Sequence, residues 1–172
     1  MNNKILTYGL WIIFLPILQV LVFNKMYLFG FINPLVYVLF IIIYPFNTNK
    51  TSLLILSFIL GFSIDLLSNE GGIHAFALVF TAYFRLFMLK IIKGEHFFDD
   101  DIDSYQTLSH TSLNIWIFVM IFIHHLLVFT MENFSFQGIL QVLAKTVSTT
   151  ILTYLIVFFI ISVFLKKQQH EW

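Results

Sequence analysis

Six apolar runs, separated by short polar intervals, constrain this chain more than any motif in it. A helix that crosses the roughly 30 Å hydrocarbon core of a bilayer needs about 20 mostly apolar residues. Several runs approach that length, and 59% of the chain is hydrophobic while 10% is charged. The sequence therefore predicts an all-α integral membrane protein, with six transmembrane helices in one bundle and one domain over residues 1–172. The predicted spans are residues 5–23, 34–46, 53–67, 73–92, 113–131 and 138–165.

The composition also argues against several classes of protein. The formal net charge is zero, so no basic footprint indicates a nucleic-acid partner. The chain has no cysteine, which excludes disulfides, thiol chemistry and cysteine-ligated metals. Its first apolar run is too long for the core of a signal peptide and no small-residue cleavage site follows it. We therefore expect that run to be a membrane span.

The second predicted span is unusually short. It begins at Pro34, a favourable first residue for a helix, and ends near Pro45. A helix of about 12–14 residues is only about 20 Å long, which is less than the hydrocarbon thickness. We expect this span to borrow residues 29–32 or to lie where the bilayer is thinner.

The distribution of lysines predicts the orientation. Cytoplasmic loops of membrane proteins carry an excess of lysine and arginine. In a six-span arrangement one side holds only Lys25, and a five-span arrangement separates the lysines less cleanly. Both termini are therefore expected in the cytoplasm. The lysines of that side are Lys4, Lys50, Lys90, Lys93, Lys166 and Lys167.

Asp65 is an acid inside an apolar run. A charge at mid-bilayer costs about 2.5–3.5 kcal/mol on insertion scales, so such residues usually face a bundle interior or a partner. Gly61 precedes Asp65 by one helical turn, and Gly72 belongs to a tight reversal after it. The sequence leaves three interpretations open: a structural role, as a pair with Lys145 or as a cap on a loop amide; partner docking; and a proton or ligand site.

Other polar residues lie in the later spans. Arg85 is expected to be a snorkelling or structural cation, with Tyr83, His124 and His125 as possible partners. The two histidines point about 100° apart on a helix, which argues against a shared metal site. The hydroxyl residues of the last span, small enough to let helices approach closely, predict a face packed against protein. They are Thr146, Ser148, Thr149, Thr150 and Thr153.

No catalytic pattern is apparent. Residues 99–103 space their acids like a calcium loop, but Ser104 and His110 stand where such a loop needs glycine and glutamate. Walker, zinc-protease, nucleophile-elbow and dinucleotide-binding motifs are missing from the sequence. We therefore predict no enzymatic activity, no cofactor and no bound metal.

The order of features resembles one family. Asn33-Pro34 starts the second span, Gly61-Phe-Ser-Ile-Asp65-Leu-Leu lies in the third, and Gly72-Ile-His-Ala75 turns into the fourth. This set resembles the MreD family of bacterial rod-shape-determining membrane proteins, over about residues 33–90. Gly61, Asp65, Gly72 and Ala75 fit the pattern best.

The resemblance implies a multi-pass protein of the bacterial cytoplasmic membrane that takes part in cell elongation. It implies a bundle similar to the substrate-binding subunits of vitamin transporters, and a non-catalytic adaptor that binds the scaffold MreC. MreB, RodA and penicillin-binding protein 2 would be indirect partners, beside membrane lipid and a possible second copy of the chain. The candidate partner-binding or polar-groove residues are Gly61, Asp65, Gly72, Ala75, Arg85, Lys145, Thr146, Thr149, Thr150 and Thr153.

A second function fits the same bundle. The chain could be the substrate-binding membrane subunit of a vitamin-type uptake transporter. That function predicts a polar cavity, open to the outside and lined by Asp65, His74 and Lys145. It also predicts tight retention of a small ligand.

Overall fold

The computed structural model describes residues 2–26, 28, 30–94, 104–133 and 138–165, and the regular structure of this part is helical apart from one isolated β-bridge between Leu28 and Ile32. Five of its helices are long and apolar enough to cross a membrane. These are α1 (Asn2–Leu21), α3 (Lys50–Ser68), α4 (Ile73–Lys93), α5 (His110–Asn133) and α6 (Ile139–Phe164). The short elements are the 3₁₀ helices η1 (Phe23–Lys25), η2 (Val36–Val38) and η4 (Tyr105–Thr107) and the α-helix α2 (Leu39–Ile43).

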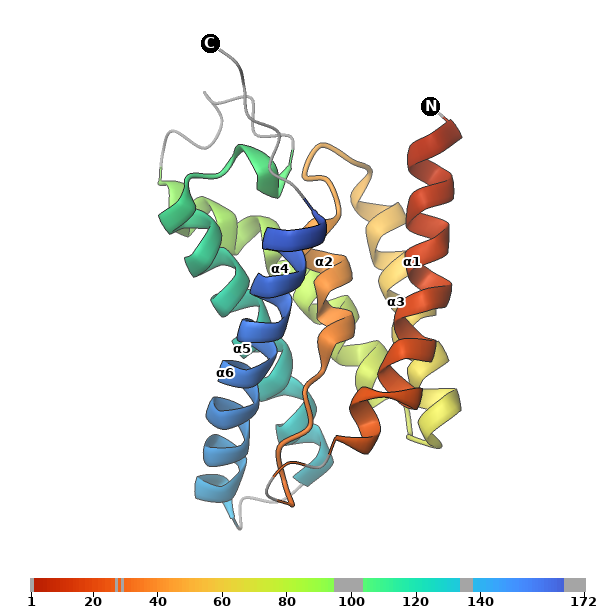
Figure 1. Cartoon of the computed structure of the whole chain (residues 1–172), viewed down its shortest axis with the longest axis vertical. Coiled ribbons are helices and arrows are strands. Elements are labelled where there is room, and N and C mark those ends of the chain that lie inside the picture. The colour runs from red at the N-terminus through yellow and green to blue at the C-terminus, as the bar shows by residue number, and fades with distance from the viewer. Residues whose placement is uncertain (1, 27, 29, 95–103, 134–137, 166–172) are drawn as a thin grey trace.

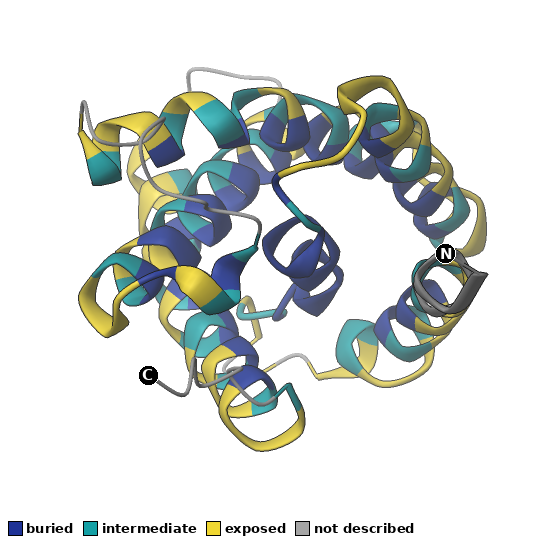
Figure 2. Ribbon diagram, turned by 90° about the horizontal axis from the view of Figure 1, so that it is seen from above, coloured by how far each residue is buried: buried dark blue, intermediate teal, exposed yellow. Residues whose placement is uncertain are grey.

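The long helices surround the short ones. Contacts join α1 to α3, α3 to α4, α4 to α5 and α5 to α6, so the long helices follow one another around the bundle. Seen from above, they enclose a fully buried central segment, which is η2 with α2 (Figure 2). Figure 1 shows that α1 begins and α6 ends at the same end of the bundle. That end is also where α3 and α5 begin and where α4 ends.

The predicted second span, residues 34–46, is not a continuous helix. It contains one 3₁₀ turn and five α-helical residues, and the backbone is extended at Tyr44. Every residue of η2 and α2 is at most 6% exposed. The segment therefore has no need to match the bilayer thickness, because protein rather than lipid surrounds it. Irregular backbone is tolerated at membrane depth when it is buried in protein.

Gln19 satisfies the backbone at the start of this central segment. Its Oε1 accepts a hydrogen bond from the Val36 N–H at 2.9 Å, and its Nε2 donates to the Pro34 carbonyl at 3.0 Å. The same Nε2 donates to Asn24 Oδ1 at 2.8 Å, and Asn24 Nδ2 donates to Ser68 Oγ at 3.0 Å. These bonds tie α1 and α3 to the central segment and supply partners that a non-helical backbone needs away from water.

The central segment also joins two apolar clusters. Val36, Val38 and Ile42 pack in a cluster with residues of α5 and α6, including Trp116 and Val157. Other side chains of the same segment pack in a second cluster, mainly with residues of α1, α3 and α4. Its members include Leu15, Tyr37, Phe40, Ile41, Leu60, Ile64 and Leu78. Both halves of the bundle therefore depend on the same short stretch of chain.

Gly61 allows α3 and α4 to cross at close range. A Cβ placed on Gly61 would lie 2.5 Å from Ala75 Cα, 2.7 Å from Ala75 N and 2.7 Å from the His74 carbonyl oxygen. All three are backbone atoms, which cannot move aside as a flexible side chain would. Small residues at membrane helix crossings let backbones approach in this way.

We expect Gly61→Ala to lower the free energy of unfolding by about 1–3 kcal/mol, because the extra methyl group forces the two helices apart. Gly9→Ala in α1 is the matched control, since a Cβ there meets nothing within 4 Å. It should be neutral or stabilising by up to about 1 kcal/mol, the gain in helix propensity. SDS-titration unfolding followed by tryptophan fluorescence measures both. Equal stability of the two variants would contradict this account of the crossing.

Candidate functional site

Asp65 lies in the last turn of α3 and caps the start of α4. Its Oδ1 accepts the His74 N–H at 3.0 Å and its Oδ2 accepts the Ala75 N–H at 2.8 Å. The residue at the helix N-cap, Gly72, has no side chain to do this. The first N–H groups of a helix lack partners within the helix and carry partial positive charge, so a carboxylate is well placed there. Asp65 is only 1% exposed.

The turn between α3 and α4 holds this geometry. Asn69 adopts the left-handed conformation with φ of 57° at the end of α3, and Gly72 follows with φ of 90°. The Glu70 N–H donates to the Asp65 carbonyl at 2.8 Å, which closes the helix end. Asp65 therefore terminates α3 through its backbone and starts α4 through its side chain. The structural role as a cap on an amide is confirmed.

The alternative structural role, a pair between Asp65 and Lys145, is wrong. Lys145 Nζ lies 2.7 Å from Glu132 Oε2, and the two side chains are 27% and 34% exposed. The ammonium also lies 4.2 Å from the centre of the Phe129 ring. Lys145 belongs to α6, which packs beside α5 rather than α3, so it does not reach Asp65. Exposed ion pairs of this kind contribute about 0–1 kcal/mol.

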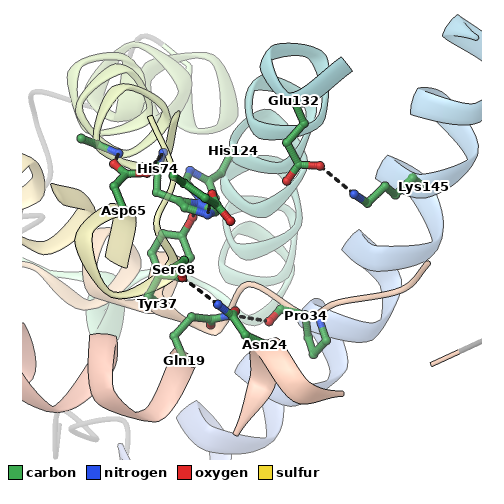
Figure 3. Close-up of polar contacts among 12 residues, drawn as sticks. Gln19, Asn24, Pro34, Tyr37, Asp65, Ser68, His74, His124, Glu132 and Lys145 are labelled. Atoms are coloured by element: carbon green, nitrogen blue, oxygen red, sulfur yellow. Dashed lines mark hydrogen bonds and ion pairs between the residues drawn. The ribbon is translucent and has the colours of Figure 1, made fainter. Parts of the chain in front are cut away.

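A chain of hydrogen bonds runs inward from the same turn. Glu70 Oε2 lies 2.6 Å from His74 Nε2, His74 Nδ1 lies 2.5 Å from the Tyr37 hydroxyl, and that hydroxyl lies 2.8 Å from His124 Nε2. Figure 3 shows Tyr37 beside both imidazoles, with Asp65 next to His74. The chain links the α3–α4 turn to the central segment and to α5. His74, Tyr37 and His124 are all buried, whereas Glu70 is exposed.

Among the residues joined by these hydrogen bonds, Glu70 is the one that lies in the α3–α4 turn, outside the helices. Its hydrogen bond with His74 is the main cause that lowers the pKa of the Glu70 carboxyl, with burial acting in the opposite direction. Electrostatic interactions with His74 and Lys145 lower this pKa further. Glu70 is therefore held in the ionised form beside His74.

Arg85 closes the other end of the central segment. Its NH1 donates to the carbonyls of Ile41 and Tyr44 at 3.2 and 3.0 Å, and its NH2 donates to the Pro45 carbonyl. Pro45 has no N–H, so the Ile41 carbonyl lacks the donor that a continuing helix would supply. The partners proposed from the sequence, Tyr83, His124 and His125, are wrong. Arg85 instead acts as a cationic cap for the C-terminus of α2.

The threonine face of α6 lies inside the bundle. Thr146, Thr149, Thr150 and Thr153 are each 0% exposed, which confirms a face packed against protein for these four residues. Ser148, predicted on the same face, is only half-buried and donates to the Ala144 carbonyl of its own helix. Thr153 Oγ1 lies 3.2 Å from His125 Nε2, and His125 Nδ1 donates to the Ile121 carbonyl at 2.7 Å. The Gly61–Ala75 contact is likewise internal. The candidate partner-binding residues at the α3–α4 crossing and the four threonines of α6 are therefore covered by this chain's own helices.

Several of these residues were not singled out from the sequence. Gln19, Tyr37, Glu70 and Glu132 make polar contacts that only the packing of helices distant in sequence reveals. Gln19 can be recognised from the sequence, because a lone amide in an apolar run needs a hydrogen-bond partner away from water. Tyr37 cannot be recognised from the sequence, since it is one of seven tyrosines and nothing in its local sequence distinguishes it. The acidic residues 99–103 lie outside the described residues.

A separate cavity of about 300 Å³ lies at the opposite end of the bundle from Asp65, where α5 begins and α6 ends. Its lining mixes apolar side chains such as Phe158 with polar ones such as Gln106 and Asn114. Tyr105 also lines it, and burial raises the pKa of that hydroxyl. Asp65, His74 and Lys145, predicted to line a ligand cavity together, are not among the residues around it.

Comparison with known proteins does not assign the chain to a family or a fold. No protein-family model matches the chain, and no curated protein or solved structure matches it.

Proposed function

We propose that this chain is a non-catalytic membrane adaptor of the bacterial cell-elongation machinery, which binds the single membrane span of an MreC-type scaffold. The observation that carries the proposal is the convergence of its family-like residues on one joint. Gly61, Asp65 and Ala75 meet where α3 crosses α4, and Gly72 forms the turn between them. These residues support the sequence resemblance to the MreD family as one structural unit.

The chemistry of that joint favours a scaffold. At the joint, the carboxylate of Asp65 accepts hydrogen bonds from two backbone amides. Away from the joint, at the end of the central segment, the guanidinium of Arg85 likewise donates to three backbone carbonyls. These charges stabilise a bundle whose outer surface is apolar, with exposed side chains such as Phe62, Leu66 and Phe87. A partner helix would add van der Waals contacts along that surface, with any interhelical hydrogen bond worth about 0.6–2 kcal/mol.

The directions of the helices support the orientation that an adaptor of this kind requires, with both termini on one side of the membrane. The long helices and the central segment alternate in direction, and α1 begins at the end where α6 ends (Figure 1). We propose six crossings of the bacterial cytoplasmic membrane with both termini in the cytoplasm, the side on which lysines are in excess. Reporter fusions at the two termini test this orientation. Fusions that report opposite sides would overturn it.

Co-expression with MreC from the same cell tests the adaptor function. We expect a stable complex in mild detergent, and loss of that complex when the MreC span is replaced by a polyleucine helix of the same length. The complex should survive Glu132→Gln, because that exposed acid belongs to a surface ion pair. Failure of intact MreC to co-purify, or turnover of a substrate by the isolated chain, would overturn the proposal.

The transporter-subunit alternative is less well supported. Lys145 pairs with Glu132, so it does not join Asp65 and His74 in lining one polar cavity, as this function predicts. Native mass spectrometry of the purified chain separates the two functions. A metabolite bound in a one-to-one ratio would favour the transporter subunit, whereas a co-purifying single-span protein would favour the adaptor.

A further inference from the structure

Asp65, Glu70 and His74 bring three metal-ligating side chains together at the α3–α4 turn. One carboxylate oxygen from each acid and one imidazole nitrogen all lie within 4.8 Å of one another. Asp65 and His74 are buried, and Glu70 is exposed, so the cluster reaches from the protein interior to its surface. The sequence does not predict this cluster, because nothing in the local pattern shows that Glu70 and His74 turn back toward Asp65.

We propose that these three residues bind a divalent transition-metal cation, with Zn²⁺ as the representative ion. One imidazole and two carboxylates form a nitrogen and oxygen ligand set that suits such cations. The two negative charges balance the charge of the cation, which lowers the cost of placing it near a membrane interior. The fourth position of a tetrahedral site would be open to water beside Glu70.

The existing contacts of Asp65 are compatible with this role. Each carboxylate oxygen has two lone pairs, and each accepts only one backbone N–H in the α4 cap. One lone pair on each oxygen therefore remains, and one of these can bind the cation. The N-terminus of α4 would stay capped while the metal is bound.

Small side-chain movements bring the cluster to metal-binding geometry. Ligands about 2.0–2.1 Å from a tetrahedral zinc ion lie about 3.3 Å apart. The Glu70 oxygen and His74 nitrogen, now 2.6 Å apart, would have to separate slightly. The Glu70 side chain is 33% exposed and lies in a turn, so it can rotate to do so. The three ligand atoms lie within 4.8 Å of one another, so the other ligand spacings differ from the zinc value by about 1.5 Å at most.

The surroundings of His74 provide independent support. A histidine that ligates a metal nearly always has its other ring nitrogen hydrogen-bonded, which fixes the tautomer and the ring orientation. Here His74 Nδ1 lies 2.5 Å from the Tyr37 hydroxyl, which in turn lies 2.8 Å from His124 Nε2. Metal binding would displace the proton that His74 Nε2 donates to Glu70. With Nδ1 then donating to Tyr37 and Tyr37 donating to His124, the Nε2 lone pair of His74 is directed to the cluster. Tyr37 is therefore a positioning residue.

Metal analysis of the untagged full-length chain tests the proposal. After removal of metal with EDTA and exchange into clean detergent buffer, the chain is titrated with Zn²⁺ and separated from free ion, and bound metal is counted by mass spectrometry. We expect one Zn²⁺ per chain, and a visible absorption band when Co²⁺ is used instead. Fewer than about one tenth of a Zn²⁺ per chain at saturation would overturn the proposal.

Variants distinguish Zn²⁺ binding at this site from general electrostatic attraction of the cation to acidic side chains. Glu70→Gln changes an exposed ligand and should weaken Zn²⁺ binding at least about tenfold, and Tyr37→Phe should weaken it about 10–100-fold through the orientation of His74. Glu132→Gln is the matched control, an exposed acid paired with Lys145, and should bind Zn²⁺ like the unmodified chain. Equal weakening in Glu70→Gln and Glu132→Gln would overturn the site. Because the isolated chain is used, the result does not depend on whether MreC binds.

Discussion

Arg85→Met should lower the free energy of unfolding by about 3–5 kcal/mol, the largest effect we expect from a single substitution. The change leaves the carbonyls of Ile41, Tyr44 and Pro45 without their donor inside the bundle. Each unsatisfied buried group costs about 1–3 kcal/mol, and removing the desolvated guanidinium recovers part of that cost. Arg85 is 2% exposed, so water cannot readily replace its hydrogen bonds. SDS-titration unfolding measures the loss.

Two further variants test whether Arg85→Met loses stability because the carbonyls of the central segment lose their donor. Lys145→Met also removes one cation, but from an exposed ion pair, and should cost no more than about 1 kcal/mol. Arg85→Lys keeps the charge but lacks the planar fork of donors that reaches several carbonyls, so its stability should lie between that of Arg85→Met and the unmodified chain. If Arg85→Met were no more destabilising than Lys145→Met, the capping of the central segment by Arg85 would be disproved.

Asp65→Ala should lower the free energy of unfolding by about 2–5 kcal/mol. The amides of His74 and Ala75 would both lose their acceptor, at about 1–3 kcal/mol each in a buried position. Asp65→Asn keeps one carbonyl oxygen and replaces the other acceptor with a donor, so it should recover about half of the loss. The same SDS titration gives these values.

Ser63→Ala is the matched control for Asp65→Ala in the same helix. The Ser63 hydroxyl is exposed and donates to the Ile59 carbonyl, four residues earlier, so its removal should change stability by no more than about 0.5 kcal/mol. An effect of Asp65→Ala as small as that of Ser63→Ala would show that the carboxylate does not hold α4. Hydrogen exchange at the His74 and Ala75 amides, faster in Asp65→Ala, would locate the effect at the cap.

The long helices were predictable from the sequence because each is determined by a contiguous stretch of residues. The predicted spans 53–67 and 73–92 correspond to α3 at Lys50–Ser68 and α4 at Ile73–Lys93. A helix satisfies its backbone internally, so apolar length alone indicates where one can form. The same reasoning failed for residues 34–46, since the backbone of that segment is satisfied from outside by Gln19 and Arg85.

The candidate site was predictable only in part. The sequence identified Asp65, Gly61 and Arg85 as residues that need a partner or a close neighbour, because a charge or a glycine in an apolar run is conspicuous. It could not identify their partners, which are backbone groups of other elements. Membrane helices are apolar toward both lipid and protein, so hydrophobicity says little about which face of a helix turns inward.

The sequence by itself determined that the chain has stretches long and apolar enough to span a membrane, and where those stretches form long helices. It also determined which polar residues need a hydrogen-bonding or charged partner away from water. The tertiary structure decided that residues 34–46 form a central segment, that Asp65 caps α4 rather than pairing with Lys145, and that the threonines of α6 face inward. The physical reason is that helix formation depends on neighbours along the chain. The rotation and pairing of helices depend on contacts between residues far apart in sequence.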